Sequence, residues 1–464
     1  MPDIIADNIS IVHSDKLEMS TRIDAEHYRK EYIALRKHID DIGSVPLKGL
    51  ISSRVITGHT PSMKNPKYYG GDINFIKTDN LRDNQIVKDF NHSLTELGNK
   101  QIQRSTLKEK DVIVTIIGAS FDIIGRASLV PKKILPANIN QNIALIRVNE
   151  NVVSEYLTVY LNTKHGRKYL HCLSRQTEQV NLSCREVELL KVPLFTKEFQ
   201  FKIKSLIESS NKFLEQSNSC YHHAENLLID EVGVSNIALS HDPCYEVNSA
   251  DTISACRIDA EYYQPKYEGL IDTIKKHPFK TIGDMFRLVK GIEPGSSVYC
   301  EEGKPFIRVS NLNKFEINNN NQQYLSEETY SALESQYQPL KGEILLSKDA
   351  TPGITYHLKE QTDGIISGGI MRLQALSNIN KEYVCLVINS LVGQSQMERD
   401  SGGSVISHWK PAQIKNTLIP FLSPKVQEEI EHLCTESFFA RRLAKKLLEE
   451  AKRKVEEMIE KGRE

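Results

Sequence analysis

The spacing of the cysteines bears on metal and redox chemistry. None of the eight forms a C-x-x-C pair. Structural zinc sites use Cys and His ligands in closely spaced pairs, so this spacing predicts scattered reduced thiols. The sequence also lacks a Walker-type phosphate loop, a Gly-x-Ser-x-Gly turn and a His-Glu-x-x-His motif. It therefore predicts no metal site and none of the common hydrolase centres.

Two local patterns come closer to enzymatic chemistry. Asn65-Pro66-Lys67-Tyr68 resembles the Asn-Pro-Pro-Tyr motif of adenine methyltransferases, but the second proline is absent and no Phe-x-Gly-x-Gly loop lies upstream. Acidic residues beside lysines, such as Glu109-Lys110, could belong to a nuclease, yet such pairs are common in a chain with 26% charged residues. We expect no catalytic residue in this chain.

Polar residues in Gly- and Pro-shaped loops could instead bind a polar surface. Hydroxyls, amides and cationic side chains supply the necessary donors and acceptors. The candidates are Thr57, Gly58, His59, Thr60, Ser62, Lys77, Thr78, Asn80, Ser120 and Phe121 in the first half, and Ser296, Arg308, Ser310, Asn311, Ser347 and Lys348 in the second. The alternative is that these residues form ordinary turns with capping hydroxyls or solvated Asn turns.

Two further segments, 138–142 and 367–369, precede the next expected strands and could complete the same loops. Trp409 is the only tryptophan and could stack on a ligand. It aligns with Leu182 in the first half, so we expect it to pack in the core.

The overall charge is nearly balanced. The chain has 59 basic and 60 acidic residues, which counts against binding nucleic acid through phosphate contacts alone. A local basic surface or partner subunits could still supply those contacts. Because no apolar run approaches the roughly 20 residues of a membrane span and Met1–Ser14 lacks a signal pattern, we expect a soluble cytoplasmic protein with no membrane partner.

The 464-residue sequence contains two copies of one repeating unit. Arg22-Ile-Asp-Ala-Glu26 recurs as Arg257-Ile-Asp-Ala-Glu261, followed in each copy by two tyrosines at the same spacing. Further matches keep the same order along the chain. They pair Phe75–Leu81 with Phe306–Leu312, Glu155-Tyr156 with Glu382-Tyr383, Asn162 with Asn389, Gly166 with Gly393 and Pro193 with Pro420. The shared order predicts an internal repeat.

Each copy has the same predicted plan. About 170 residues carry short β-type runs, such as 111–117, 143–148, 342–346 and 369–373, separated by turn residues. A long helical pattern follows, from about Lys197 to Val232 in the first copy. The linker 234–254 then leads into the second copy.

The two long helices carry matching heptads. The seam of the first is Phe199, Ile203, Leu206, Ser210, Phe213, Ser217, Cys220, Ala224 and Leu227, and that of the second is Val426, Ile430, Leu433, Ser437, Ala440, Ala444, Leu447, Ala451 and Lys454. Steps of four and three predict two helices that pack on each other, with small residues allowing close approach. The alternatives are two separate amphipathic helices and, at the end of the second seam, fraying or a shift to Val455.

A helix of this length spans about 50 Å at 1.5 Å per residue. It could hold two similar modules over major grooves, which recur about every 34 Å along DNA. Because the modules have diverged, the two half-sites would differ in sequence.

The loop residues resemble a known family. Gly58–Ser62, Tyr68–Ile73 and Phe75–Leu81 are similar to the opening of a target recognition domain in specificity subunits of type I restriction-modification systems, and Leu182–Leu194 resembles its closing segment. The second copy, Gly291–Pro420, is more divergent. The resemblance covers nearly the whole chain and rests on arrangement more than on any single motif.

The resemblance implies a mixed α/β fold with two target recognition domains, at 1–195 and 255–422. Between and after them lie conserved spacer helices at 196–233 and 423–464, which form an antiparallel coiled coil with a pseudo-twofold repeat. It also implies binding of double-stranded DNA and of two methyltransferase subunits, which a restriction subunit can join. S-adenosylmethionine would be bound by those partners, with no cofactor in this chain.

Two other functional classes remain open. A protein–protein adaptor with duplicated modules agrees with the near-neutral charge and predicts no specific retention on DNA. A stand-alone nuclease predicts metal-dependent cleavage by the isolated chain.

Overall fold

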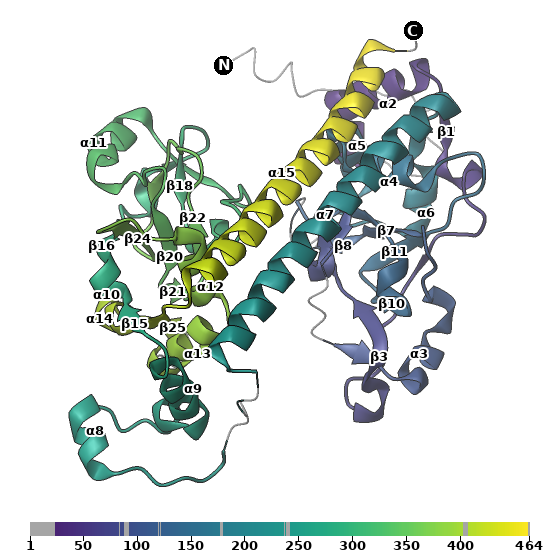
Figure 1. Ribbon diagram of the computed structural model, residues 1–464. Coiled ribbons are helices and arrows are strands. Elements are labelled where there is room, and N and C mark those ends of the chain that lie inside the picture. The colour runs from purple at the N-terminus through teal and green to yellow at the C-terminus, as the bar shows by residue number, and fades with distance from the viewer. Residues whose placement is uncertain are drawn as a thin grey trace. The chain divides into compact units, whose positions relative to one another are not determined.

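The computed structural model of the chain describes residues 24–82, 84–87, 92–118, 120, 122–176, 180–235, 237, 242–401 and 407–462. It forms two compact units, the first comprising Met1–Phe213 with Leu443–Glu464 and the second Leu214–Arg442. Each unit contains a mixed α/β domain and one half of each long helix, α7 (Lys197–Val232) and α15 (Pro424–Lys461) (Figure 1).

The first unit is built on a four-stranded antiparallel sheet. Its strand order is β2 (Ile56–Thr57), β11 (Ile143–Ile146), β7 (Val112–Thr115) and β9 (Ala127–Leu129). A three-stranded sheet contains β10 (Ala137–Ile139), β3 (Tyr69–Ile76) and β6 (Ser93–Leu94), with β10 and β3 parallel. Smaller sheets join β12 (Arg175–Gln176), β13 (Val180–Asn181) and β8 (Ile117–Gly118), β1 (Ser44–Pro46) and β14 (Lys191–Pro193), and β4 (Leu81–Arg82) and β5 (Gln85–Ile86).

The second unit repeats this order of sheets. Its four-stranded sheet runs β16 (Phe286–Lys290), β24 (Ile370–Ala375), β20 (Ile344–Ser347) and β22 (Thr355–His357). Beside it lie β17 (Tyr299–Cys300), β19 (Gln323–Leu325), β18 (Lys304–Ile307) and β23 (Ile365–Ile366), with β18 and β23 parallel. The remaining pairs are β21 (Asp349–Ala350) with β25 (Ser407–His408) and β15 (Phe279–Thr281) with β26 (Leu418–Pro420).

Helices cover these sheets in the same sequence positions. The first unit has α2 (Lys30–Asp41), α3 (Glu96–Gln101), α4 (Ser154–Asn162), α5 (Lys164–Leu173) and α6 (Cys184–Leu189). The second has α9 (Pro265–Lys275), α10 (Ile282–Met285), α11 (Glu327–Tyr337), α12 (Lys381–Asn389), α13 (Leu391–Asp400) and α14 (Pro411–Asn416). An additional helix, α8 (Ser249–Ala255), lies where the sequence predicts only a linker.

The residues that recur in the sequence make the same contacts in both units. The Tyr156 hydroxyl donates to the carbonyl of Pro193 at 2.6 Å, and that of Tyr383 donates to Pro420 at 2.8 Å. Asn162 clamps the backbone N–H and C=O of Ala127, as Asn389 does for Thr355. The matched residues are therefore scaffold contacts, and the predicted repeat is confirmed.

The predicted strands and the first long helix are also confirmed. Val112–Thr115 and Ile344–Ser347 are fully buried central strands, which explains their unbroken apolar runs. Helix α7 begins after Thr196, whose hydroxyl accepts the N–H of Phe199, and ends before Gly233. Gly233 adopts a positive φ of 78° that favours glycine, and its N–H donates to Ile229 as in a helix C-cap.

The two long helices pack on each other and run antiparallel. Within the first unit the Ser210 hydroxyl donates to the carbonyl of Ala444 at 2.7 Å. Within the second, the hydroxyls of Ser217 and Ser437 lie 3.0 Å apart. Since a higher number on α7 pairs with a lower number on α15, the direction is antiparallel, and the alternative of two separate helices is excluded. The fold class predicted from the sequence is confirmed.

Nine of the eighteen predicted seam positions are buried, and at six of the other nine a buried hydrophobic residue is the next one along the chain. Ile203, Ser210, Ser217 and Ala224 on α7 are buried as predicted, as are Ile430, Ser437, Ala440, Ala444 and Ala451 on α15. At the intervening positions, however, the most buried residues are Ile207, Tyr221, Leu228, Cys434, Leu448 and Val455. Phe199, Leu206, Phe213, Val426, Leu433 and Leu447 are only partly buried. Each half of each helix also packs on the domain of the unit to which that half belongs, so the buried stripe is wider than a strict heptad seam.

Candidate nucleic-acid interface

Four loops of the first unit meet at one edge of its sheets. A Cβ atom at Gly58 would lie 1.9 Å from the carbonyl oxygen of Ile139, so only glycine allows this approach. The Thr60 hydroxyl donates to the side chain of Gln141, and the N–H of Asn140 donates to the carbonyl of Ile76. The N–H of Ile116, directly after β7, donates to the carbonyl of Asn142 at 2.9 Å, so the loops after β2, β3 and β10 lie beside the end of β7.

The second unit brings the equivalent loops together in the same way. A Cβ atom at Gly291 would lie 2.2 Å from the carbonyl oxygen of Ser367. The N–H of Lys348 donates to Gly369 at 2.8 Å, and the N–H of Trp409 donates to Lys348 at 2.8 Å. The topology therefore places most of the sequence candidates of each half at a single edge.

Side-chain exposure separates the candidates of the first unit. Thr57, His59, Ser62 and Ser120 are exposed, Thr60, Lys77 and Thr78 are half-buried, and Gly58 is buried. Phe121 lies outside the described residues. The exposed hydroxyls and imidazole present donors and acceptors beyond the edge, as binding to a polar surface requires.

Asn80 and Asn311 are internal to the protein. Asn80 accepts the backbone N–H of Lys77 at 2.9 Å, and Asn311 accepts that of Arg308 at 3.1 Å. Their side-chain amides also donate to backbone carbonyls of the following loop, and both side chains are buried. These two residues hold the turns together, which is the alternative role that the sequence left open.

The candidates of the second unit divide in the same manner. Ser296 and Ser310 are exposed, whereas Ser347 is fully buried and donates to the carbonyl of Thr351 at 2.6 Å. Arg308 is half-buried, and its guanidinium donates to the carbonyl of Asn321. Lys348 is 8% exposed and pairs with the carboxylate of Asp349.

Asp349, which directly follows the candidates Ser347 and Lys348, and His408, which precedes Trp409, also stand at this edge. Asp349 Oδ1 lies 2.7 Å from His408 Nδ1. Burial alone would raise the pKa of Asp349, but hydrogen bonds from His408 and Lys348 outweigh burial and hold the pKa below its ordinary value. The sequence could have indicated Asp349 through its position just after a buried strand. Its pairing with His408 could not be predicted, because it arises only when β21 pairs with β25.

Trp409, beside His408, is fully buried in the main core of the second unit, as predicted. Its backbone N–H binds Lys348, as that of Leu182 binds Ile116 in the first unit. The aligned positions thus occupy equivalent places, and Trp409 cannot stack on a ligand without leaving the core.

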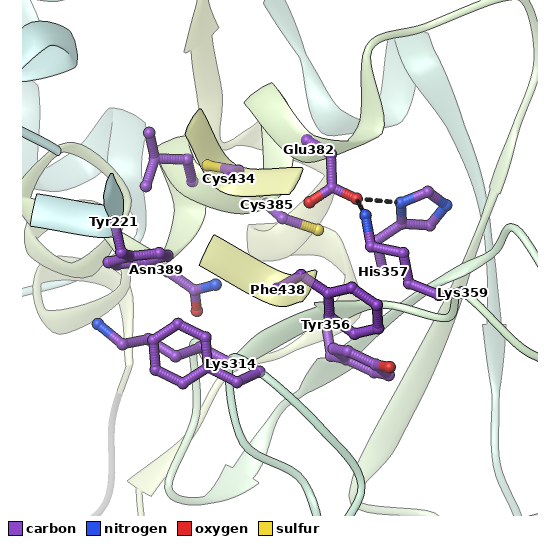
Figure 2. Close-up of a pocket in the computed structure, with 12 residues that line it drawn as sticks. Tyr221, Lys314, Tyr356, His357, Lys359, Glu382, Cys385, Asn389, Cys434 and Phe438 are labelled. Atoms are coloured by element: carbon purple, nitrogen blue, oxygen red, sulfur yellow. Dashed lines mark hydrogen bonds and ion pairs between the residues drawn. The ribbon is translucent and has the colours of Figure 1, made fainter. Parts of the chain in front are cut away.

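A second polar cluster lies beside the helix pair within the second unit. In Figure 2, Glu382 faces His357 and Lys359, and its carboxylate lies 2.5 Å from His357 Nδ1. Burial would raise the pKa of Glu382, but these two partners outweigh it and lower the pKa. The carboxylate is therefore held in its charged form by the surrounding residues.

Cation–aromatic contacts continue this cluster. Lys314 Nζ lies 4.2 Å from the centre of the Tyr221 ring, and Arg441 Cζ lies 3.8 Å from that of Phe315. Tyr221 belongs to α7 and Arg441 to α15, so both helices hold the loop around Lys314. These contacts position the domain of this unit on its own halves of the two helices.

Among the residues that the structure describes, no group of three or more His, Cys, Asp or Glu side chains is arranged to hold a metal ion. No described helix has both the length and the apolar character that a membrane span requires.

The chain is similar to characterised specificity subunits. It is 24% identical over 288 residues to the type I restriction enzyme MjaIX specificity subunit of Methanocaldococcus jannaschii, covering 59% of this chain and 60% of that protein. It is 26% identical over 162 residues to the HindI specificity subunit of Haemophilus influenzae, covering 34% of each. The chain thus spans 60% or less of the length of these relatives.

A solved structure, the type I restriction-modification S subunit from M. genitalium, aligns with 90% of this chain and 94% of its own at a TM-score of 0.41 and 14% identity. The family model of the type I restriction modification DNA specificity domain matches residues 40–245 and 275–452, once in each half. The resemblance inferred from the loops is confirmed, and the chain belongs to the family of type I restriction-modification DNA specificity domains.

Proposed function

We propose that this chain is the sequence-specific DNA-recognition subunit of a type I restriction-modification complex, with each unit reading one half of a split, asymmetric target. This proposal rests on a contrast between the buried contacts that hold each unit together and the exposed polar side chains at the loop edge of its sheets. Buried contacts such as Tyr156–Pro193 and Tyr383–Pro420 are the same in both units. The exposed polar side chains at the equivalent edges differ, as two different half-sites require.

The chain acts as a non-catalytic scaffold in this proposal. Two methyltransferase subunits dock on it through the paired helices, bind S-adenosylmethionine and methylate an adenine flipped out of the duplex. A restriction subunit can join the same assembly. Family membership supports these partners, and none of the proposed chemistry is assigned to a residue of this chain.

The test is methylome sequencing of a host that expresses this chain with its candidate methyltransferase partner. Deleting this chain alone should abolish methyladenine at one split, asymmetric motif. Replacing Gly291–Pro420 with the matching segment of a family member should change one half of the motif and leave the other intact. An unchanged methylome after deletion would instead favour the adaptor, and metal-dependent cleavage by the isolated chain would favour a nuclease.

A further inference from the structure

We infer that His408, oriented by Asp349, is a base-reading residue of the second recognition domain and accepts a hydrogen bond from an exocyclic amino group in the major groove. This inference rests on the proposed function and names a specificity-determining pair within it. The pair is carried by β21 and β25, in which Asp349 stands directly opposite His408.

The carboxylate of Asp349 is held in place from two sides. It directly follows the central strand β20, and its Oδ2 atom pairs with the nearly buried Lys348. The backbone N–H of Lys348 is itself bonded to Gly369, on the neighbouring loop. A carboxylate fixed in this way can orient a more exposed partner, as a supporting residue does in other binding sites.

The imidazole of His408 has one nitrogen directed inward and one available. Nδ1 lies 2.7 Å from Asp349 Oδ1, so the neutral ring carries its proton on Nδ1 and donates it to the carboxylate. Nε2 is then an acceptor, and no described residue hydrogen-bonds to it. The side chain is 57% exposed, compared with 26% for Asp349, so the imidazole stands further into solvent than the carboxylate.

An oriented acceptor selects among the four bases. In the major groove, the donors are the N6 amino group of adenine and the N4 amino group of cytosine, whereas guanine and thymine present acceptors at the corresponding oxygens. A neutral imidazole whose Nδ1 faces Asp349 presents Nε2 as its acceptor toward these groups. The expected preference is therefore for adenine or cytosine at one position of the second half-site.

The first unit offers an internal comparison. There Asn181 of β13 stands opposite Ile117 of β8, in the place that His408 and Asp349 occupy in the second unit. Asn181 is exposed, but the opposing residue has no carboxylate to orient it. An asparagine amide presents both a donor and an acceptor and can pair with adenine N6 and N7. The two edges thus differ in chemistry at one equivalent exposed position.

The experiment is methylome sequencing with the full chain and its methyltransferase partner, using His408→Ala and Asp349→Asn. We expect His408→Ala to relax one base position of the second half-site, with preference for adenine or cytosine there reduced about tenfold, which equals about 1.4 kcal/mol. Asp349→Asn can support either imidazole tautomer and should relax the same position. Asn181→Ala should relax a position in the other half-site only, and the exposed Glu328→Ala on α11 should leave the motif unchanged.

A structural role for the pair predicts a different pattern. If His408→Ala lowered methylation equally at every site, or left the motif unchanged, the inference would be overturned. A wild-type preference for guanine or thymine at the relaxed position would also overturn it. Deleting the whole chain provides the separate test of the proposed function: loss of methylation on deletion together with an unchanged His408→Ala motif rejects only the base-reading pair.

Discussion

Individual residues show why the two halves of this chain keep the same core. Asn162 accepts the N–H of Ala127 at 3.0 Å and donates to its carbonyl at 2.7 Å. It is 6% exposed, so water cannot replace these bonds. The same pair of bonds joins Asn389 to Thr355 in the second unit. Few other side chains can bond both the N–H and the C=O of one strand residue, which explains why asparagine recurs at this position in the second unit.

Replacing Asn162 with alanine should therefore be costly. Two backbone groups lose their partners, and each buried unsatisfied group costs about 1–3 kcal/mol, so we expect the free energy of unfolding to fall by about 2–4 kcal/mol. Urea denaturation of the purified chain measures it. Asn151→Ala, at an exposed turn of the same unit, is the matched control and should change stability by less than about 0.5 kcal/mol. If the two variants lowered the free energy of unfolding equally, the stabilising role of the Asn162 hydrogen bonds would be contradicted.

Glu343 predicts a pH-dependent contribution to stability. Burial would raise its pKa, but Arg372, the N–H of Leu340 and the amide of Gln374 together lower the pKa below its ordinary value. A lowered folded pKa means that the stabilisation is complete above the unfolded pKa of about 4.3 and is lost as pH falls through the folded value. The stability difference between wild type and Glu343→Gln should shrink when urea denaturation is repeated from pH 7 down to pH 3. A difference that stays constant over this range would exclude the ionic contribution.

At the scale of elements, the helix pair depends on small residues. Ser217 and Ser437 are fully buried and bonded to each other, which leaves no room for a larger side chain. Ser217→Leu should destabilise the second unit by about 1–3 kcal/mol through overpacking. Ser219→Leu, exposed on the same helix, is the control and should be almost neutral.

The double variant Ser217→Ala with Ser437→Ala separates packing from hydrogen bonding. Removing both partners of a buried bond leaves neither unsatisfied, so the change should be close to neutral. Thermal unfolding followed by circular dichroism would compare these variants. If the double alanine variant were as unstable as Ser217→Leu, the hydrogen bond rather than close packing would dominate the seam.

At the scale of the whole molecule, the balanced charge predicts that, in the proposed complex, partner subunits supply most of the phosphate contacts to DNA. With 59 basic and 60 acidic residues, the chain has few spare cations for phosphate contacts. The dependence of affinity on salt reports the number of phosphates neutralised, with a slope of about −0.9 per contact. We expect the isolated chain to show a shallower slope than the proposed complex with methyltransferase subunits. Fluorescence anisotropy on target DNA at several salt concentrations measures both, and equal slopes would place the phosphate contacts on this chain.

The sequence by itself determined the features that depend on local pattern. Residue order and apolar periodicity predicted the repeat, the buried strands such as Val112–Thr115, and the helix from Lys197 to Val232. These features are predictable because a given pattern of apolar and turn residues favours the same local structure wherever it occurs in the chain. The family resemblance followed from the arrangement of the whole chain together with loops such as Gly58–Ser62, whose glycine is required by a backbone approach that recurs in the second unit.

The tertiary structure alone decided which polar residues are exposed and which are internal. Asn80 and Asn311, which the sequence offered as either binding or turn residues, are buried and cap turns, and Ser347 is buried beside its own loop. His408 became a candidate only because β25 pairs with β21, which brings it to Asp349 across 59 residues. The seam shifted at alternate positions for the same reason: each helix packs on a domain as well as on its partner, and heptad spacing contains no information about that second surface.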